Sequence, residues 1–193
     1  MKRPRIVNKK LLSTIQKYIK KHHSLYSTPV RSEQWDEILF KSLKENGYDV
    51  NWDPYTHKIG EDVFCAGYGR ISCKGGVINN HTVHGEYLSF NGSRTTSYKT
   101  LNEKIEFMKN KKEDVYFCLA KYKADKKNIT EYQLIVFDTK LIDYKKLKWN
   151  KHKKDFRGQS KGLYVEIRNA LSDQLWIHIH MYKLKNIYTI PVA

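Results

Sequence analysis

The 193-residue chain has little cysteine, little proline and no long hydrophobic run. Its three cysteines, Cys65, Cys73 and Cys118, are an odd number without close pairing, which argues against a disulfide-stapled secreted domain. No stretch approaches 18 uncharged apolar residues, and no apolar run follows the basic N-terminus, so we expect neither a membrane span nor a secretory signal. These absences predict a cytoplasmic protein with reduced, buried thiols.

Acidic residues are scarce as well, and the shortage is local. The chain carries 36 Lys and Arg against 20 Asp and Glu, a formal net charge of +16. Residues 1–30 hold eight basic residues and no acid, and residues 145–161 hold eight basic residues and one acid. Two basic segments on a nearly neutral body indicate that the binding partner is a polyanion. We expect this partner to be nucleic acid rather than an acidic membrane surface.

The hydrophobic pattern predicts one α/β domain over residues 1–193, with a mixed central sheet and flanking helices. Helices are expected over 8–22, 32–46, 100–111 and, as a short element, 139–148. Strands are expected over 48–52, 61–66, 70–74, 77–83, 86–90, 115–122, 132–138, 162–168 and 174–182. The basic residues 145–161 are expected to form a loop.

A Gly-Tyr-Gly turn at residues 67–69 carries the most informative pattern. A symmetric hairpin around it places Asp62 opposite Lys74 on one face, with Ser72 beside them, and leaves the apolar residues on the other face. A carboxylate and a lysine so placed suit metal-assisted phosphodiester hydrolysis, because the carboxylate can bind Mg²⁺ and the lysine can act on the attacking water. A solvated cross-strand ion pair is the alternative.

The order of these elements resembles a known family. A helix (32–46), three strands, a helix (100–111) and a strand (115–122) resemble the αβββαβ core of the PD-(D/E)XK nucleases, and the motifs around Asp62 and Ser72-Cys73-Lys74 resemble small type II restriction endonucleases. The resemblance covers about residues 30–140. It implies a restriction-endonuclease-like core and a Mg²⁺-dependent, sequence-specific endodeoxyribonuclease that cuts double-stranded DNA, commonly as a homodimer.

The resemblance also implies roles for single residues. Asp62 and the Cys73 carbonyl would bind the metal and Lys74 would act on the water, whereas Ser72 stands where the family has an acidic residue and would participate indirectly. Glu37 or Glu33 in the preceding helix is a candidate for the missing carboxylate, although both share a face with lysines and fit a solvated ion-pair ladder. Glu61 is a further candidate.

Polar and basic side chains in three regions are candidates for DNA contact. They are Arg70, Arg94, Thr95, Ser97, Lys99, Lys151, Lys153, Lys154, Arg157, Gln159 and Lys161. The basic helix over 8–22 is a possible clamp, and His178 and His180 share a strand face with Trp176 that we expect to contact DNA or another subunit. A non-catalytic nucleic-acid-binding module and a repair or recombination nuclease of the same fold are the alternative functions.

Overall fold

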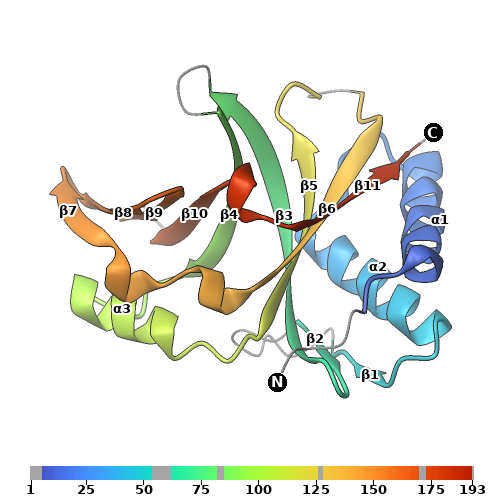
Figure 1. Ribbon diagram of the computed structural model, residues 1–193, viewed down its shortest axis with the longest axis horizontal. Helices are drawn as coiled ribbons and strands as arrows, with labels where there is room; N and C mark the ends of the chain where they lie inside the picture. Colours follow the sequence, from blue (N-terminus) through green and yellow to red (C-terminus); the bar gives the residue numbers. More distant parts are fainter. Residues whose placement is uncertain (1–5, 54–61, 82–84, 126–127, 170–172, 193) are drawn as a thin grey trace.

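Eleven strands form one mixed sheet in the computed structural model, which describes residues 6–53, 62–81, 85–125, 128–169 and 173–192 (Figure 1). The α-helices within these ranges are α1 (Lys9–Leu25), α2 (Ser32–Glu45) and α3 (Leu101–Lys109). The strands are β1 (Val50–Asn51), β2 (Val63–Cys65), β3 (Gly69–His81), β4 (Gly85–Arg94), β5 (Val115–Tyr122), β6 (Glu131–Asp138), β7 (Lys148–His152), β8 (Asp155–Ser160), β9 (Leu163–Arg168), β10 (Gln174–His180) and β11 (Asn186–Pro191). The mixed α/β fold class is therefore confirmed.

Capping residues mark the starts of α1 and α3, whereas α1 continues beyond its predicted end at residue 22 to Leu25. The Asn8 side chain accepts a hydrogen bond from the Leu11 backbone N–H at the start of α1. Thr100 and Glu103 exchange side-chain to backbone hydrogen bonds at the start of α3, which together form a capping box. After α2, Gly47 adopts a positive φ of 80°, a conformation that favours glycine at a helix end.

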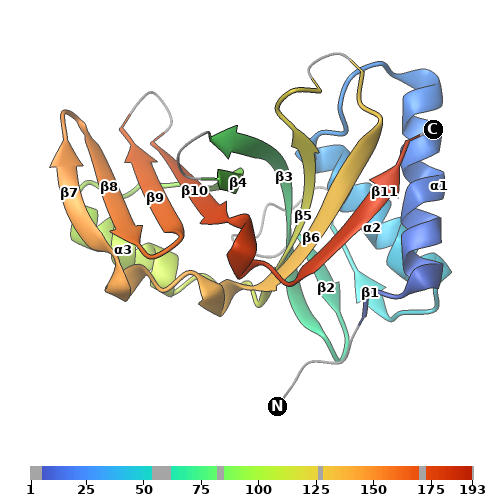
Figure 2. The ribbon, with the colours of Figure 1, turned by 45° about the horizontal axis from the view of Figure 1, so that its top comes forward.

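The strand order is β11-β6-β5-β3-β4-β10-β9-β8-β7, and β1 and β2 extend from β3. β3 runs parallel to β5 and antiparallel to its other neighbours. α1 contacts β11 at one end of the sheet, whereas β7 forms the other end, so the two basic segments lie at opposite ends (Figure 2).

Two apolar clusters form the core. The first joins α1 and α2 to β3, β5, β6 and β11, and Trp35, which is fully buried, donates a hydrogen bond from its indole nitrogen to the Phe117 carbonyl. The second lies between the two halves of the sheet and α3, with Leu88, Ile177 and Val165 at its centre. β10 alternates between residues buried in this second cluster and partly exposed residues, which is the expected pattern for a strand with one solvated face.

Several sequence predictions need correction. The β2–β3 hairpin pairs Val63 with Ile71 and Cys65 with Gly69, so its register is two residues away from the symmetric one. A shift of two preserves the faces, because side chains alternate with a period of two. Residues 139–148 form two short 3₁₀ turns rather than an α-helix, and the basic residues 145–161 contain the whole β7–β8 hairpin rather than a loop.

Candidate active site

The candidate site lies at an interruption along one edge of β3. β2 pairs with residues 69–71 of this edge and β4 pairs with residues 76–81, while β5 occupies the opposite edge over residues 71–78. Residues 72–75 therefore face a gap between β2 and β4. Because the N–H and C=O of one strand residue project toward the same edge, backbone polar groups of this segment are directed into the gap.

Asp62 fills part of this gap. Its backbone N–H donates to the Ile71 carbonyl at 3.0 Å, beside the Val63–Ile71 pair that ends the ladder. Its Oδ2 accepts hydrogen bonds from the Cys73 backbone N–H at 2.7 Å and from the Ser72 hydroxyl at 3.1 Å. Since the Cys73 N–H points into the gap, the Cys73 carbonyl faces the same edge of the strand.

The Lys74 ammonium lies beside the same carboxylate. Its Nζ is 3.6 Å from Asp62 Oδ2, and both side chains are largely buried, with 19% and 27% of their surfaces exposed. The structure therefore brings Asp62, Ser72 and Lys74 together, as predicted from the alternation of side chains. Ser72 is a hydrogen-bond donor to the carboxylate.

A second carboxylate, Asp36 on α2, joins this cluster. Ligand atoms of Asp36, Asp62 and Cys73 all lie within 4.8 Å of one another. The Cys73 thiol hydrogen-bonds to the Asp36 carboxylate, whereas Asp36 Oδ1 is buried and has no hydrogen-bond partner among the described residues. One carboxylate oxygen of Asp36 thus remains available to a cation.

Burial dominates the electrostatics of this carboxylate. The pKa of Asp36 is raised from 3.8 to about 7, chiefly by desolvation and then by the negative charge of Asp62, while Lys74 acts in the opposite direction. Burial, with the charges of Asp36 and Asp62, also raises the pKa of the Cys73 thiol well above its ordinary value. The thiol stays protonated near neutral pH, and the two facing carboxylates form the part of the cluster that a cation would stabilise.

These groups fit a hard divalent cation. Mg²⁺ prefers oxygen ligands and is commonly held by one or two carboxylates together with waters and substrate oxygens. Asp36 and Asp62 supply two carboxylates, and the Cys73 carbonyl, which the backbone directs toward the same strand edge, is the candidate for a third oxygen. The unpartnered Asp36 oxygen is the observation that favours a cation here.

The sequence prediction did not include Asp36, and Glu37, which it did include, does not join this cluster. The Glu37 side chain is 46% exposed and pairs with Lys41 one turn along α2, as the alternative interpretation expected. Glu33 is also exposed, and Glu61 lies outside the described residues. The prediction of Glu37 as the helix carboxylate is therefore corrected to Asp36.

A second buried ion pair borders the cluster. Lys111 Nζ lies 2.5 Å from Glu113 Oε1 and donates to the Gly92 carbonyl at 3.1 Å, and the Tyr116 hydroxyl donates to Glu113 at 2.7 Å. Burial lowers the pKa of Lys111, although the Glu113 charge opposes this effect. These contacts anchor the segment before β5 against β4, beside the strand that carries Lys74.

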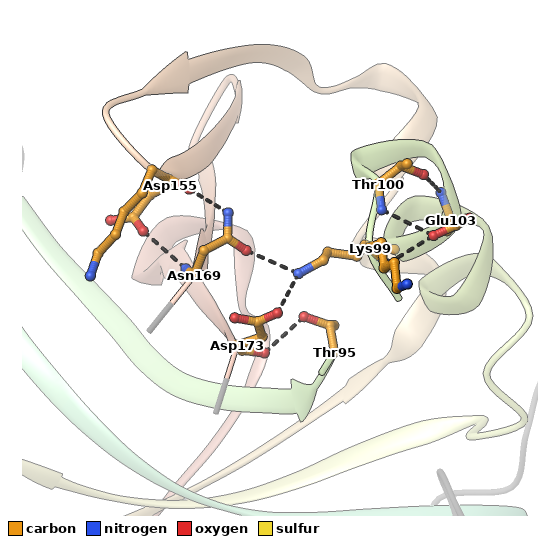
Figure 3. Close-up of polar contacts among 9 residues, drawn as sticks. Thr95, Lys99, Thr100, Glu103, Asp155, Asn169 and Asp173 are labelled. Carbon is orange, nitrogen blue, oxygen red and sulfur yellow. Dashed lines mark hydrogen bonds and ion pairs between the residues drawn. The ribbon is translucent and has the colours of Figure 1, made fainter. Parts of the chain in front are cut away.

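Thr95 is a buried structural residue, contrary to its prediction as a DNA contact. It is 1% exposed, and its hydroxyl and backbone N–H both donate to the Asp173 carbonyl (Figure 3). The buried Lys104 donates to Asn169 Oδ1 and to Asp173 Oδ2 at 2.9 and 2.8 Å, which ties α3 to the end of β9 and the start of β10. The hydrogen-bonding groups of Thr95 are thus used inside the protein.

The other predicted DNA contacts lie mostly at the surface. The exposed ones are Arg94, Ser97, Lys99, Lys151, Lys153, Lys154, Gln159 and Lys161. Arg70 is partly buried, and its guanidinium donates to the Lys112 carbonyl at 3.2 Å. Arg157 is partly buried and pairs with Glu166. The contact of these residues with DNA stays a prediction.

Comparison with known proteins finds no match to this chain. The chain matches no protein-family model and has no significant match to a curated protein or to a solved structure. Among the described residues, no helix has the length and apolar character needed to cross a membrane. The functional argument therefore depends on the site itself.

Proposed function

We propose that this protein is a Mg²⁺-dependent endodeoxyribonuclease that cuts double-stranded DNA at specific sequences, as a type II restriction endonuclease does. The observation that carries the proposal is the cluster at the interrupted edge of β3. There Asp62 accepts hydrogen bonds from Ser72 and Cys73, faces the second carboxylate of Asp36 and lies 3.6 Å from the Lys74 ammonium.

Each group has a chemical role in phosphodiester hydrolysis. Asp36, Asp62 and the Cys73 carbonyl would hold Mg²⁺, which when bound activates water and neutralises charge on the phosphate. Lys74 would orient the attacking water and stabilise the negative charge that develops on the phosphate oxygens. Ser72 donates a hydrogen bond to the Asp62 carboxylate and so orients an oxygen that would bind the metal.

The order of the elements also supports the proposal. α2, β1, β2, β3, α3 and β5 follow in the order expected of an αβββαβ core, and β5 runs parallel to β3. β4 is an addition between β3 and α3, and it continues the sheet toward β10. In this interpretation Asp36 replaces the acidic residue that is missing at Ser72.

The charge distribution supports a long polyanion as substrate. The basic helix α1 lies beside β11, and the basic hairpin β7–β8 lies at the other end of the strand order, so the two segments flank the site. Lysines at both ends of the molecule attract phosphates without regard to sequence. A homodimer, which would cut both strands of a palindromic site, belongs to the same proposal.

Plasmid cleavage tests the proposal. We expect wild-type protein with Mg²⁺ to produce fragments of defined length, EDTA to abolish cleavage, and Asp36→Asn, Asp62→Asn and Lys74→Ala each to reduce the rate at least a hundredfold. Glu37→Gln is the matched control on α2, because this exposed side chain pairs with Lys41, and it should cut at the wild-type rate. Wild-type rates in the Asp62 and Lys74 variants would overturn the assignment.

Ser72 favours one rival function. A serine in place of the acidic residue is also compatible with a non-catalytic DNA-binding module that keeps the fold. Such a module predicts salt-sensitive DNA binding with no cleavage in Mg²⁺. A repair or recombination nuclease predicts cutting at branches or mismatches instead of at a defined sequence, so the same digests separate the three functions.

A further inference from the structure

Over strands β8, β9, β10 and β4, the sheet face opposite α3 carries a row of aromatic and polar side chains. Residues that lie opposite each other in the strand register share a face. Those of this row are Gln159 on β8, Tyr164 on β9, His178 on β10 and Ser89 on β4. The apolar residues that alternate with them, such as Val165, pack with α3 on the other side. The row therefore lies on the face that α3 leaves uncovered, and β7 of the basic hairpin continues the sheet past β8 (Figure 2).

A cavity of about 650 Å³ lies on this face, a volume within the usual range of small-molecule sites. Tyr87, Tyr164 and His178 give it aromatic walls, and the centroids of the Tyr164 and His178 rings are 5.2 Å apart. The side chains of Asn79 and Ser89 add an amide and a hydroxyl to the lining. The cavity combines aromatic rings with neutral polar groups, which suits a flat ligand that carries its own hydrogen-bonding groups.

A chain of hydrogen bonds fixes the position of the proton on His178. Asn79 Nδ2 donates to the Ser89 hydroxyl at 3.0 Å, and this hydroxyl lies 2.8 Å from His178 Nδ1. Because Ser89 accepts from Asn79, its own hydrogen is directed to His178 Nδ1, and the neutral ring then carries its hydrogen on Nε2. Burial lowers the pKa of His178 below its ordinary value, so the ring is largely neutral at pH 7.

The other nitrogen of the His178 ring lacks a partner. Nε2 is buried and has no hydrogen-bond partner among the described residues, and His178 is one of the residues that line the cavity. A buried donor without an acceptor costs free energy, and most such groups in proteins are hydrogen-bonded. A ligand that brings an acceptor atom to Nε2 would remove this cost. The site therefore favours a flat ring with an acceptor on its edge.

Exposed lysines lie around the cavity. Lys123 is one of the lining residues, and Lys161 stands between two of them in the turn from β8 to β9. Lys148 lies opposite Gln159 in the register of β7 and β8. None of the described residues that line the cavity is acidic. A ligand that carries a negative group beside its flat ring would therefore meet only positive charge at the edge of the cavity, and lysine is a common partner of phosphate.

We propose that this cavity binds the unpaired base of a nucleotide, with Tyr164 stacking on the base, His178 Nε2 donating to it and the surrounding lysines at its phosphate. A nucleobase is flat, carries acceptors on its edge and is joined to a phosphate, and aromatic side chains on a sheet are a common platform for unpaired bases. A free nucleotide and an unpaired nucleotide of a strand present the same groups. The site is separate from the proposed cutting site, because Ser89 pairs with Val77, which lies on the face of β3 opposite to Lys74.

Strands with and without bases test the proposal. The affinity for a fluorescein-labelled oligo(dT) of about ten nucleotides is measured by anisotropy and compared with that for an abasic strand of the same length, which keeps the phosphates. We expect the wild type to bind oligo(dT) about tenfold more tightly or better. Tyr164→Leu and His178→Ala should lose most of this preference and keep the wild-type affinity for the abasic strand, which also shows that the variants are folded.

Lys151→Ala on β7 is the matched control, because this exposed lysine alternates with Lys148 and lies on the other face; it should leave the preference for oligo(dT) unchanged. Competition with dTMP distinguishes the two sources of the base. Displacement of oligo(dT) by dTMP supports a free nucleotide as ligand, and tight strand binding that dTMP does not displace supports an unpaired nucleotide within a strand. Equal affinity of the wild type for the two strands, or an unchanged preference in both cavity variants, would overturn the inference. Plasmid cleavage in Mg²⁺ tests the proposed function separately.

Discussion

The pKa of Asp36 predicts how the stability of the metal-free protein changes with pH. Its folded value of about 7 lies above the ordinary 3.8, so between these values the folded protein binds more protons than the unfolded chain. Folding stability therefore falls as pH rises through this window. A pKa difference of one between the two states corresponds to about 1.4 kcal/mol, so ionising Asp36 in the folded protein costs roughly 4 kcal/mol above pH 7.

Asp36→Asn removes this cost, because the amide keeps an acceptor for the Cys73 thiol and does not ionise. In EDTA, we expect the variant to gain up to roughly 4 kcal/mol over the wild type between pH 4 and pH 8. Urea unfolding at several pH values measures the difference. Glu33→Gln, an exposed neighbour on α2, is the matched control and should show little change.

Magnesium should reverse the order of stability of the wild type and Asp36→Asn. At pH 8 the cation would bind the Asp36 and Asp62 carboxylates of the wild type and stabilise the folded state by mass action, whereas Asp36→Asn would gain less and would not cut DNA. A difference between the two proteins that stays constant from pH 4 to pH 8 would refute the electrostatic reasoning. Equal stabilisation of both by Mg²⁺ would refute the assignment of Asp36 as a ligand.

Three further substitutions test other contacts. Ser72→Ala should slow cleavage about tenfold with little loss of stability, because it removes one of two hydrogen bonds to the metal-binding carboxylate; single-turnover digests measure this effect. Lys104→Met should cost about 2–3 kcal/mol in urea unfolding, because it leaves Asp173 without its buried cation. Gly76→Ala should cost about 1–3 kcal/mol, because the new Cβ would lie 2.6 Å from Cys118 Sγ.

The sequence predicted the structure well where side chains repeat with the period of two of a strand or the period of 3.6 of a helix. Alternation along residues 62–65 and 70–74 put Asp62 and Lys74 on one side and the cysteines on the other, and an error of two in the register left that result unchanged. The long helices were equally predictable, because caps and apolar stripes mark them.

Other features depend on tertiary contacts that the pattern does not carry. Asp36 follows the buried Trp35 on α2, and the helical pattern does not say which flank of the apolar stripe meets β3. Thr95 looked solvated because its segment is polar, yet it packs against the start of β10. The β7–β8 hairpin was missed because its turn uses Lys153 at a positive φ of 55°, without the usual Asn-Gly signal.

Incubation of duplex DNA with the wild-type protein and Mg²⁺ tests the central claim most directly. The account predicts that supercoiled plasmid becomes linear fragments of defined length and that EDTA stops the reaction. Intact plasmid after incubation with folded, DNA-bound protein across a range of Mg²⁺ and Mn²⁺ concentrations would contradict it.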